Sequence, residues 1–145
     1  MILFKNTRIF DGSGAAAYPG DVLVQDNRIV AVNREGTAAT SAPGATLVDG
    51  TGTTLMPGMT EAHAHLSWPS SVERFVPGMS LPPEDLALNT ARNARILLDH
   101  GFTSAYSGGA LGKTLEITLK AEIDAGRTPG PRLVPASIEL SLIHI

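Results

Sequence analysis

Residues 55–66 read LMPGMTEAHAHL, a Pro-Gly turn followed by a short segment that ends in two histidines with one residue between them. Successive side chains of a β-strand alternate between its faces, so His63 and His65 share a face if this segment is a strand. Imidazole is a common zinc ligand, but a zinc site needs three or four donors. On these residues alone, the alternative is a pair of solvated histidines at a strand end.

Composition narrows the functions that the chain could have. Its 145 residues carry a formal net charge of −3 and no basic cluster that could neutralise a run of phosphates, so we expect no nucleic-acid partner. The absence of cysteine excludes disulfides and thiolate ligands, which leaves imidazole and oxygen as metal donors. We find no secretory signal and no apolar run of about 18 residues, and therefore expect a cytoplasmic protein without a membrane partner.

The segment before the histidines predicts a small β meander. Strands are indicated at residues 2–10, with a slip in their alternation, and at 46–50. The clearest signal is a hairpin, in which the β-branched runs 22–25 and 28–32 are separated by Asp26 and Asn27, two residues that tolerate a tight turn. Residues 34–45 have neither periodicity nor bulk and predict a loop.

The segment after residue 80 has a helical period instead. Pro82 and Pro83 lie at the entry of a predicted helix, and Gly101 is placed as the left-handed residue after its last turn. Ala87, Ala91, Ala94 and Leu98 share one stripe of this helix. A strand at 102–106, a second helix at 111–125 and a strand at 132–137 follow it. This alternation of strands and helices is typical of a parallel α/β fold.

Taken as a block, these motifs resemble the amidohydrolase superfamily, whose first barrel strand typically reads Pro-Gly-hydrophobic-hydrophobic-Asp-x-His-x-His. RIFDGSG (8–14) and GDVLVQDNRIVAV (20–32) are similar to the family's N-terminal β-sandwich, while LLDHGFTSAY (97–106) and AGRTPGPRLVPAS (125–137) are similar to its second and third strand regions. The G-x-T and G-P-R signatures resemble the imidazolonepropionase-like and prolidase-like branch most.

The resemblance implies a fold and its domain boundaries. Residues 1–57 would be a β-sandwich segment, 58–140 would be the start of a (β/α)8 TIM barrel, and 141–145 would be a non-native or disordered end. Such a barrel needs about 250 residues. We therefore expect the chain to be an N-terminal fragment, inactive by itself.

The resemblance also implies an activity. The intact protein would hydrolyse carbon–nitrogen bonds of small amide or dipeptide-like substrates through a metal-activated water, with one or two divalent ions, zinc being the expected metal. His63 and His65 would be metal ligands. The intact protein is a possible homo-oligomer. The alternatives are a non-catalytic superfamily member and a small βαβ binding module with an incidental histidine pair.

Two positions depart from the family pattern. Glu61 stands where the family usually has Asp, on the same face as His63, and we expect it to support the ligands by hydrogen bonding rather than to bind the metal. Tyr106 and Ser107 stand where relatives often have Arg-Asp, so substrate contacts from the second strand are not carried over.

The remaining candidates favour structural roles. His100 lies in the last turn of the first predicted helix, where an imidazole suits the negative end of the helix dipole. Trp68 is expected to pack, and His144 is assigned no role. Gly108-Gly109 lacks the flanking residues of a phosphate-binding loop.

Overall fold

The computed structural model describes residues 1–35, 42–68 and 81–138. It divides the chain into two compact units, Met1–Pro57 and Gly58–Ile145, which are described separately below. The C-terminal stretch 141–145 and His144 lie outside the described residues. Within those residues, no helix is long and apolar enough to cross a membrane.

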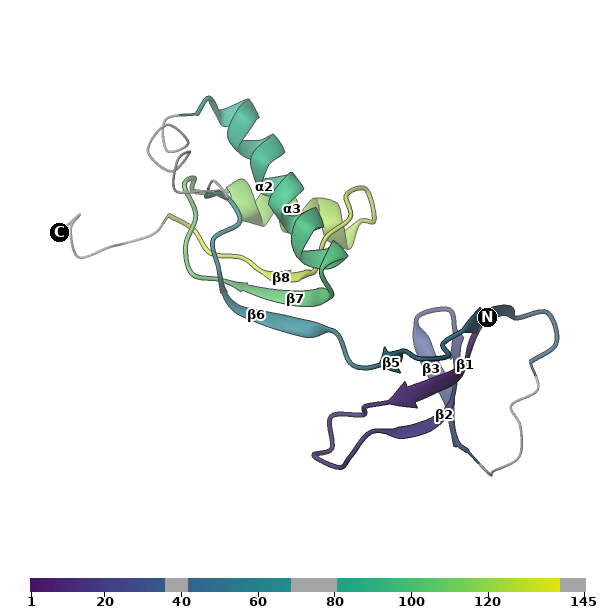
Figure 1. The fold of residues 1–145 in the computed structure, drawn as a ribbon. Coiled ribbons are helices and arrows are strands. Elements are labelled where there is room, and N and C mark those ends of the chain that lie inside the picture. The colour runs from purple at the N-terminus through teal and green to yellow at the C-terminus, as the bar shows by residue number, and fades with distance from the viewer. Residues whose placement is uncertain (36–41, 69–80, 139–145) are drawn as a thin grey trace. The chain divides into compact units, whose positions relative to one another are not determined.

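The first unit is a five-stranded sheet in the order β3-β2-β1-β4, with β5 also paired to β1 (Figure 1). Strand β1 runs antiparallel to β2 and parallel to β4 and β5, and β2 runs antiparallel to β3. The strands are β1 Ile2–Ile9, β2 Tyr18–Gln25, β3 Arg28–Arg34, β4 Thr46–Asp49 and β5 Thr54–Leu55.

Turn chemistry determines the clearest part of this sheet. Gln25 pairs with Arg28, so Asp26 and Asn27 form a two-residue turn, and Asp26 takes a positive φ of 54°. The predicted hairpin is therefore confirmed. The slip in β1 is a register shift between Phe4 and Thr7, and it leaves the buried Thr7 hydroxyl to donate to the Gly20 carbonyl at 3.1 Å.

The second unit is a parallel three-stranded sheet in the order β6-β7-β8, with α2 and α3 on one side of it (Figure 1). Its mixed α/β character agrees with the sequence pattern. Buried apolar side chains from the strands and from both helices form the core between the layers. The elements are β6 Met59–Ala64, α2 Pro83–Asp99, β7 Phe102–Ser107, α3 Leu115–Asp124 and β8 Arg132–Val134, and the buried core residues are Ala64, Leu66, Ala94, Ala105, Leu119 and Leu133.

Helix α2 begins and ends where the sequence predicts. Pro83 is its first residue, and Gly101 follows it with a φ of +86°, a conformation that glycine adopts without strain. Of the predicted apolar stripe, Ala94 is buried, Ala91 and Leu98 are half-buried and Ala87 is exposed. Thr90 is buried instead, because its hydroxyl is satisfied by the Leu86 carbonyl at 2.6 Å and so tolerates burial.

Helix α3 starts at Leu115, four residues after the predicted Leu111. Long-range contacts hold the intervening segment in a loop. Ala110 forms a parallel bridge with Ile138, and the Leu111 amide donates to the hydroxyl of the buried Ser67 at 2.8 Å. The backbone groups that a helix would use are therefore already bound to the segments after β6 and β8.

Candidate metal centre

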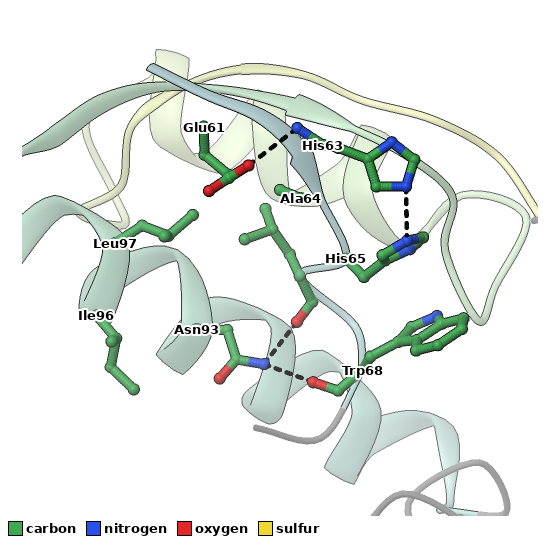
Figure 2. Close-up of a pocket in the computed structure, with 9 residues that line it drawn as sticks. Glu61, His63, Ala64, His65, Trp68, Asn93, Ile96 and Leu97 are labelled. Carbon is green, nitrogen blue, oxygen red and sulfur yellow. Dashed lines mark hydrogen bonds between the residues drawn. The ribbon is translucent and has the colours of Figure 1, made fainter. Parts of the chain in front are cut away.

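The two histidines lie at the carboxyl end of β6. His63 is inside the strand and His65 is the first residue beyond it. Their Nε2 atoms are 3.1 Å apart, and their rings meet edge to face with centroids separated by 4.9 Å (Figure 2). The structure therefore brings the predicted pair together, at the end of a parallel sheet where α/β proteins commonly bind ligands.

Two neighbours fix the ring of His65. Its Nδ1 lies 3.1 Å from the carbonyl oxygen of Gly109, an acceptor, so Nδ1 carries the hydrogen and donates it. The Trp68 ring stacks on the His65 ring, with ring centroids 4.4 Å apart and planes inclined by 28°. This tautomer leaves the lone pair on Nε2, the atom that faces His63. Trp68 therefore packs, as expected, and the side chain that it packs against is the candidate ligand His65.

The geometry of the pair suits a metal ion. Zn–N distances of about 2.0–2.1 Å in a tetrahedral site place two nitrogen donors about 3.3 Å apart, and the observed separation is 3.1 Å. A backbone carbonyl on the second ring nitrogen is the usual arrangement for a metal-binding histidine. Among the described residues, however, no group of three or more His, Cys, Asp and Glu side chains converges. These residues therefore provide two donors.

Glu61 contacts the backbone of the pair. Its Oε1 accepts a hydrogen bond from the amide of His63 at 3.0 Å, and no described contact joins it to either imidazole. Glu61 is one of the residues that line an open cavity of about 420 Å³, to which β6 and α2 both contribute. Figure 2 shows its carboxylate beside β6. A contact of this kind holds the strand end and leaves the rings to be oriented by other groups.

Asn93 holds the segment after the histidines against α2. Its amide nitrogen donates to the carbonyls of Leu66 and Trp68, at 2.8 and 2.9 Å (Figure 2). One side chain therefore satisfies two backbone acceptors in a loop that has no strand partner of its own. We infer that this contact keeps Trp68 in place to stack on His65.

The residues that sequence reasoning missed are Gly108 and Gly109, directly after β7. The Gly108 amide donates to the Ala64 carbonyl at 2.7 Å. A Cβ atom on Gly108 would lie 2.5 Å from Cε1 and Nε2 of His63, so only glycine leaves room for the ring as it stands. Gly109 supplies the carbonyl that holds His65. The glycine pair was visible in the sequence, but nothing there indicated its proximity to the histidines.

Glu116 is a further residue without a sequence signal. It lies in the first turn of α3 and its side chain has no exposed surface. Burial raises the pKa of its carboxyl group, an effect that nearby donors partly offset, among them the Ala136 amide, which donates to Oε2 at 3.3 Å.

His100 has the structural role expected of it. Its Nδ1 lies 2.8 Å from the carbonyl oxygen of Ile96, at the end of α2, where the ring adds a contact to a carbonyl that also accepts from the His100 amide at 3.1 Å. It is not among the residues that line the cavity at the histidine pair.

Comparisons with known proteins show what the chain is similar to. No protein-family model matches the chain. It is 34% identical over 74 residues, or 51% of its length, to dihydroorotase from Streptococcus pneumoniae, of which that stretch covers 17%. It is 41% identical over 68 residues, or 46% of its length, to 5'-deoxyadenosine deaminase from Methanothermobacter thermautotrophicus, of which 14% is covered. The chain thus matches less than a fifth of these curated relatives.

Solved structures match over nearly the whole chain. A candidate prolidase from Bifidobacterium longum is 28% identical, with a TM-score of 0.71 over 97% of this chain and 34% of the other. A protein described as an amidohydrolase is 25% identical, with a TM-score of 0.74 over 91% of this chain and 30% of the other. These matches show that the chain is similar to the N-terminal part of hydrolases of the amidohydrolase type.

Proposed function

We propose that this chain contributes the first two metal ligands, His63 and His65, to a metal-dependent hydrolase of carbon–nitrogen bonds. The observation that carries the proposal is the Nε2–Nε2 separation of 3.1 Å, combined with a His65 ring whose Nδ1 is bound to the Gly109 carbonyl. Solvated histidines at a strand end would have no need of a specified tautomer. The His65 ring has a specified tautomer, in which the Nε2 lone pair is directed toward His63.

Each nearby group has a separate task in this proposal. Gly108 leaves the space that the His63 ring occupies, Gly109 orients the His65 ring, and Glu61 holds the strand end through the His63 amide. A divalent ion bound here, with zinc the expected metal, would supply Lewis-acid activation of water. The other ligands and the proton-transferring group would come from residues outside the described set, because two donors do not complete a site.

The relatives support a substrate class rather than one substrate. Their names include a dihydroorotase, a deaminase and a prolidase, which are hydrolases that act on carbon–nitrogen bonds. We therefore propose a small molecule with an amide-like carbon–nitrogen bond as the substrate, and retain the prolidase-like branch as the finer placement. A cytoplasmic location is part of the same proposal, since it agrees with a chain that has no cysteine.

The fold proposal has the same basis. We propose that residues 1–57 are one part of a β-sandwich and that residues 58–140 begin a (β/α)8 barrel. The support is the division of the chain after Pro57 and the parallel order β6-β7-β8 with a helix after each of the first two strands. In such a barrel the carboxyl ends of the strands form the active site, which is where His63 and His65 lie.

A metal titration tests the ligand assignment on the chain itself. Competition between the protein and a chromophoric chelator should show weak binding of Zn²⁺, because two imidazoles leave the ion mostly hydrated. His63→Ala and His65→Ala should each abolish it. His100→Ala is the matched control, since it removes an imidazole that caps a helix, and it should bind as wild type does. Equal binding by all four proteins would refute the assignment.

The catalytic part of the proposal needs a longer protein. A product that carries this segment at the length of its relatives should lose both bound metal and turnover of its amide substrate in His63→Ala and His65→Ala. Metal content is measured by elemental analysis and turnover by substrate consumption. A His63→Ala protein with full metal content and full activity would overturn the proposed function.

A further inference from the structure

Trp68 is the one tryptophan of the sequence, and the proposed function gives it no task. It is the last residue of a four-residue turn that begins at His65, because its amide donates to the His65 carbonyl at 3.1 Å. The two residues inside this turn, Leu66 and Ser67, are buried. The turn reverses the chain directly after β6 and returns the indole to the imidazole three positions earlier, with ring centroids 4.4 Å apart and planes inclined by 28° (Figure 2).

The nitrogen contacts described above for the His65 ring do not by themselves define the plane of that ring. Nδ1 lies 3.1 Å from the Gly109 carbonyl oxygen, and Nε2 lies 3.1 Å from Nε2 of His63. Both contacts are made at points on the line through the two ring nitrogens, so they leave the imidazole able to turn about that line. A stacked ring resists this rotation, because turning the imidazole drives its edge into the indole. Trp68 therefore supplies a restraint of a different kind.

Two asparagines of helix α2 hold the turn that carries the indole. Nδ2 of Asn93 donates to the carbonyls of Leu66 and Trp68, at 2.8 and 2.9 Å. Nδ2 of Asn89 donates to the carbonyls of Ser67 and Trp68, at 3.3 and 3.4 Å. The two asparagines are four positions apart and so share one face of the helix. Because the shorter hydrogen bonds come from Asn93, we expect Asn93 to provide most of the restraint.

The same turn is bound to the loop that follows β7. The buried hydroxyl of Ser67 accepts a hydrogen bond from the amide of Leu111 at 2.8 Å. Leu111 lies two residues after Gly109, whose carbonyl accepts from the His65 ring. The two segments that contact this imidazole are therefore joined to each other as well as to the ring.

We propose that Trp68 is a positioning residue for the histidine pair, which sets the plane of the His65 imidazole, and that Asn93 acts through the turn at residues 65–68 to keep the indole in place. The inference rests on the proposed role of His65 as a metal ligand. An imidazole binds a metal ion through a nitrogen lone pair that lies in the ring plane, so the plane determines where Nε2 points. The Gly109 carbonyl determines which nitrogen carries the hydrogen, and the indole determines the direction of the other nitrogen.

The test reads the stacked arrangement directly and without metal. Protons that lie over the face of an aromatic ring are shifted upfield in NMR spectra. In the 145-residue chain at one alkaline pH, the ring protons of His65 should therefore resonate upfield of those of His100, a ring with no aromatic contact within the described residues. Trp68→Leu should remove this shift and Asn93→Ala should reduce it. Trp68→Phe keeps a smaller aromatic face and should retain part of it.

Two controls on the same helix separate positioning from a general effect of altering α2. Asn89→Ala removes only the longer hydrogen bonds and should reduce the shift less than Asn93→Ala does. Arg95→Gln breaks an exposed ion pair with Asp99 at 2.7 Å and should leave the His65 signals unchanged. A change that appears in Asn93→Ala and is absent from Arg95→Gln therefore reports the contact with the turn.

Zinc titration of the same samples gives the second measurement. Loss of an outer contact that orients a ligand costs about 10- to 100-fold in metal affinity, so we expect that loss in Trp68→Leu and less than about tenfold in Trp68→Phe. Asn93→Ala should fall between Trp68→Leu and wild type. The order of affinities should thus follow the order of the upfield shifts.

Three results would overturn the proposal. Wild-type His65 signals without the upfield shift would do so before any variant is made, and this result is decisive even if Trp68→Leu does not fold. An unchanged shift in a folded Asn93→Ala would refute the role of Asn93. Wild-type zinc affinity in a folded Trp68→Leu that has lost the shift would refute the role of Trp68. The upfield shift in wild type without zinc binding in any sample would instead overturn the metal-ligand assignment.

Discussion

Replacement of Gly108 by alanine should displace the ring of His63 and leave the fold intact. A Cβ built on Gly108 lies 2.5 Å from Cε1 and Nε2 of the ring and 2.9 Å from Cδ2, where ordinary contact begins at 3.4 Å. The ring must therefore move by about 1 Å, since van der Waals repulsion rises steeply below contact distance. The φ of Gly108 is not positive, so its backbone conformation is open to alanine.

The size of this displacement sets the expected loss of affinity. Metal–ligand distances are held within about 0.2 Å, so a shift of about 1 Å removes His63 from the position that a shared ion requires. We expect Zn²⁺ binding to weaken by about 10- to 100-fold, the range found for changes that misorient a ligand, which corresponds to about 1.4–2.7 kcal/mol of binding free energy. Chelator competition measures the binding, and thermal unfolding measures the stability.

Gly112→Ala is the matched control for this substitution. Gly112 lies in the same loop between β7 and α3, and a Cβ there would meet Leu115 at 3.4 Å, which is ordinary contact. This variant should bind zinc as wild type does. If Gly108→Ala also kept wild-type affinity and the wild-type signal of the His63 ring, the inference that Gly108 provides the space for a metal ligand would be wrong.

Three further changes probe the surroundings of the site. Gly58→Ala should lower the free energy of unfolding by about 1–3 kcal/mol, measured by urea denaturation, because its Cβ would lie 2.0 Å from Oγ1 of Thr103. Asn93→Ala should cost about 1–2 kcal/mol in the same assay, since it removes the two hydrogen bonds that Asn93 donates to the segment carrying Trp68 and leaves only the longer ones from Asn89. Burial raises the pKa of Glu116 above 4.5, its ordinary value, in the folded chain. The stability of Glu116→Gln relative to wild type should therefore increase as the pH rises above 4.5. The folded wild type then binds more protons than the unfolded chain and loses stability with rising pH, whereas the glutamine variant does not; thermal midpoints at several pH values measure the difference.

Each of these expectations has a clear contrary result. An unchanged urea midpoint in Gly58→Ala would mean that the Thr103 side chain rotates away at no cost. Equal stability of Asn93→Ala and wild type would mean that water or Asn89 replaces both hydrogen bonds. Parallel pH profiles for Glu116→Gln and wild type would show that the carboxyl is hydrated in the folded chain and that its pKa is not raised.

Local patterns were sufficient to predict the elements and their order. The Asp26-Asn27 turn, the prolines before α2 and Gly101 after it act within a few residues of the structures they determine. The start of α3 was beyond such patterns, because a bridge to Ile138 keeps residue 110 and its neighbours out of the helix. The exposure of Ala87 also could not be predicted from local patterns. The spacing of apolar residues does not show that a polar residue, Thr90, belongs to the buried face of the helix.

The residues of the candidate site also fall into two groups, those that local patterns predict and those that they do not. His63 and His65 could be predicted because a strand has a period of two, which places both on one face. Gly108 and Gly109 could not, because their role depends on the pairing of β6 with β7, which joins residues more than 40 positions apart, as the 44-residue separation between His65 and Gly109 shows. In the sequence they are simply two glycines after a strand.

The contacts that orient the ligands are made mainly by backbone atoms, which explains why residue types alone did not reveal them. A carbonyl accepts from His65, a missing side chain makes room for His63, and the His63 amide donates to the Glu61 carboxylate. Any residue has a carbonyl and an amide, so only the path of the chain determines where these groups point. It follows that Gly109 and Gly108 are constrained for different reasons, the first by its φ of 142° and the second by the ring beside it. If the His63 ring did not occupy its position, Gly108 would have room for a larger residue. Gly109 would still require glycine, because its φ would be unchanged.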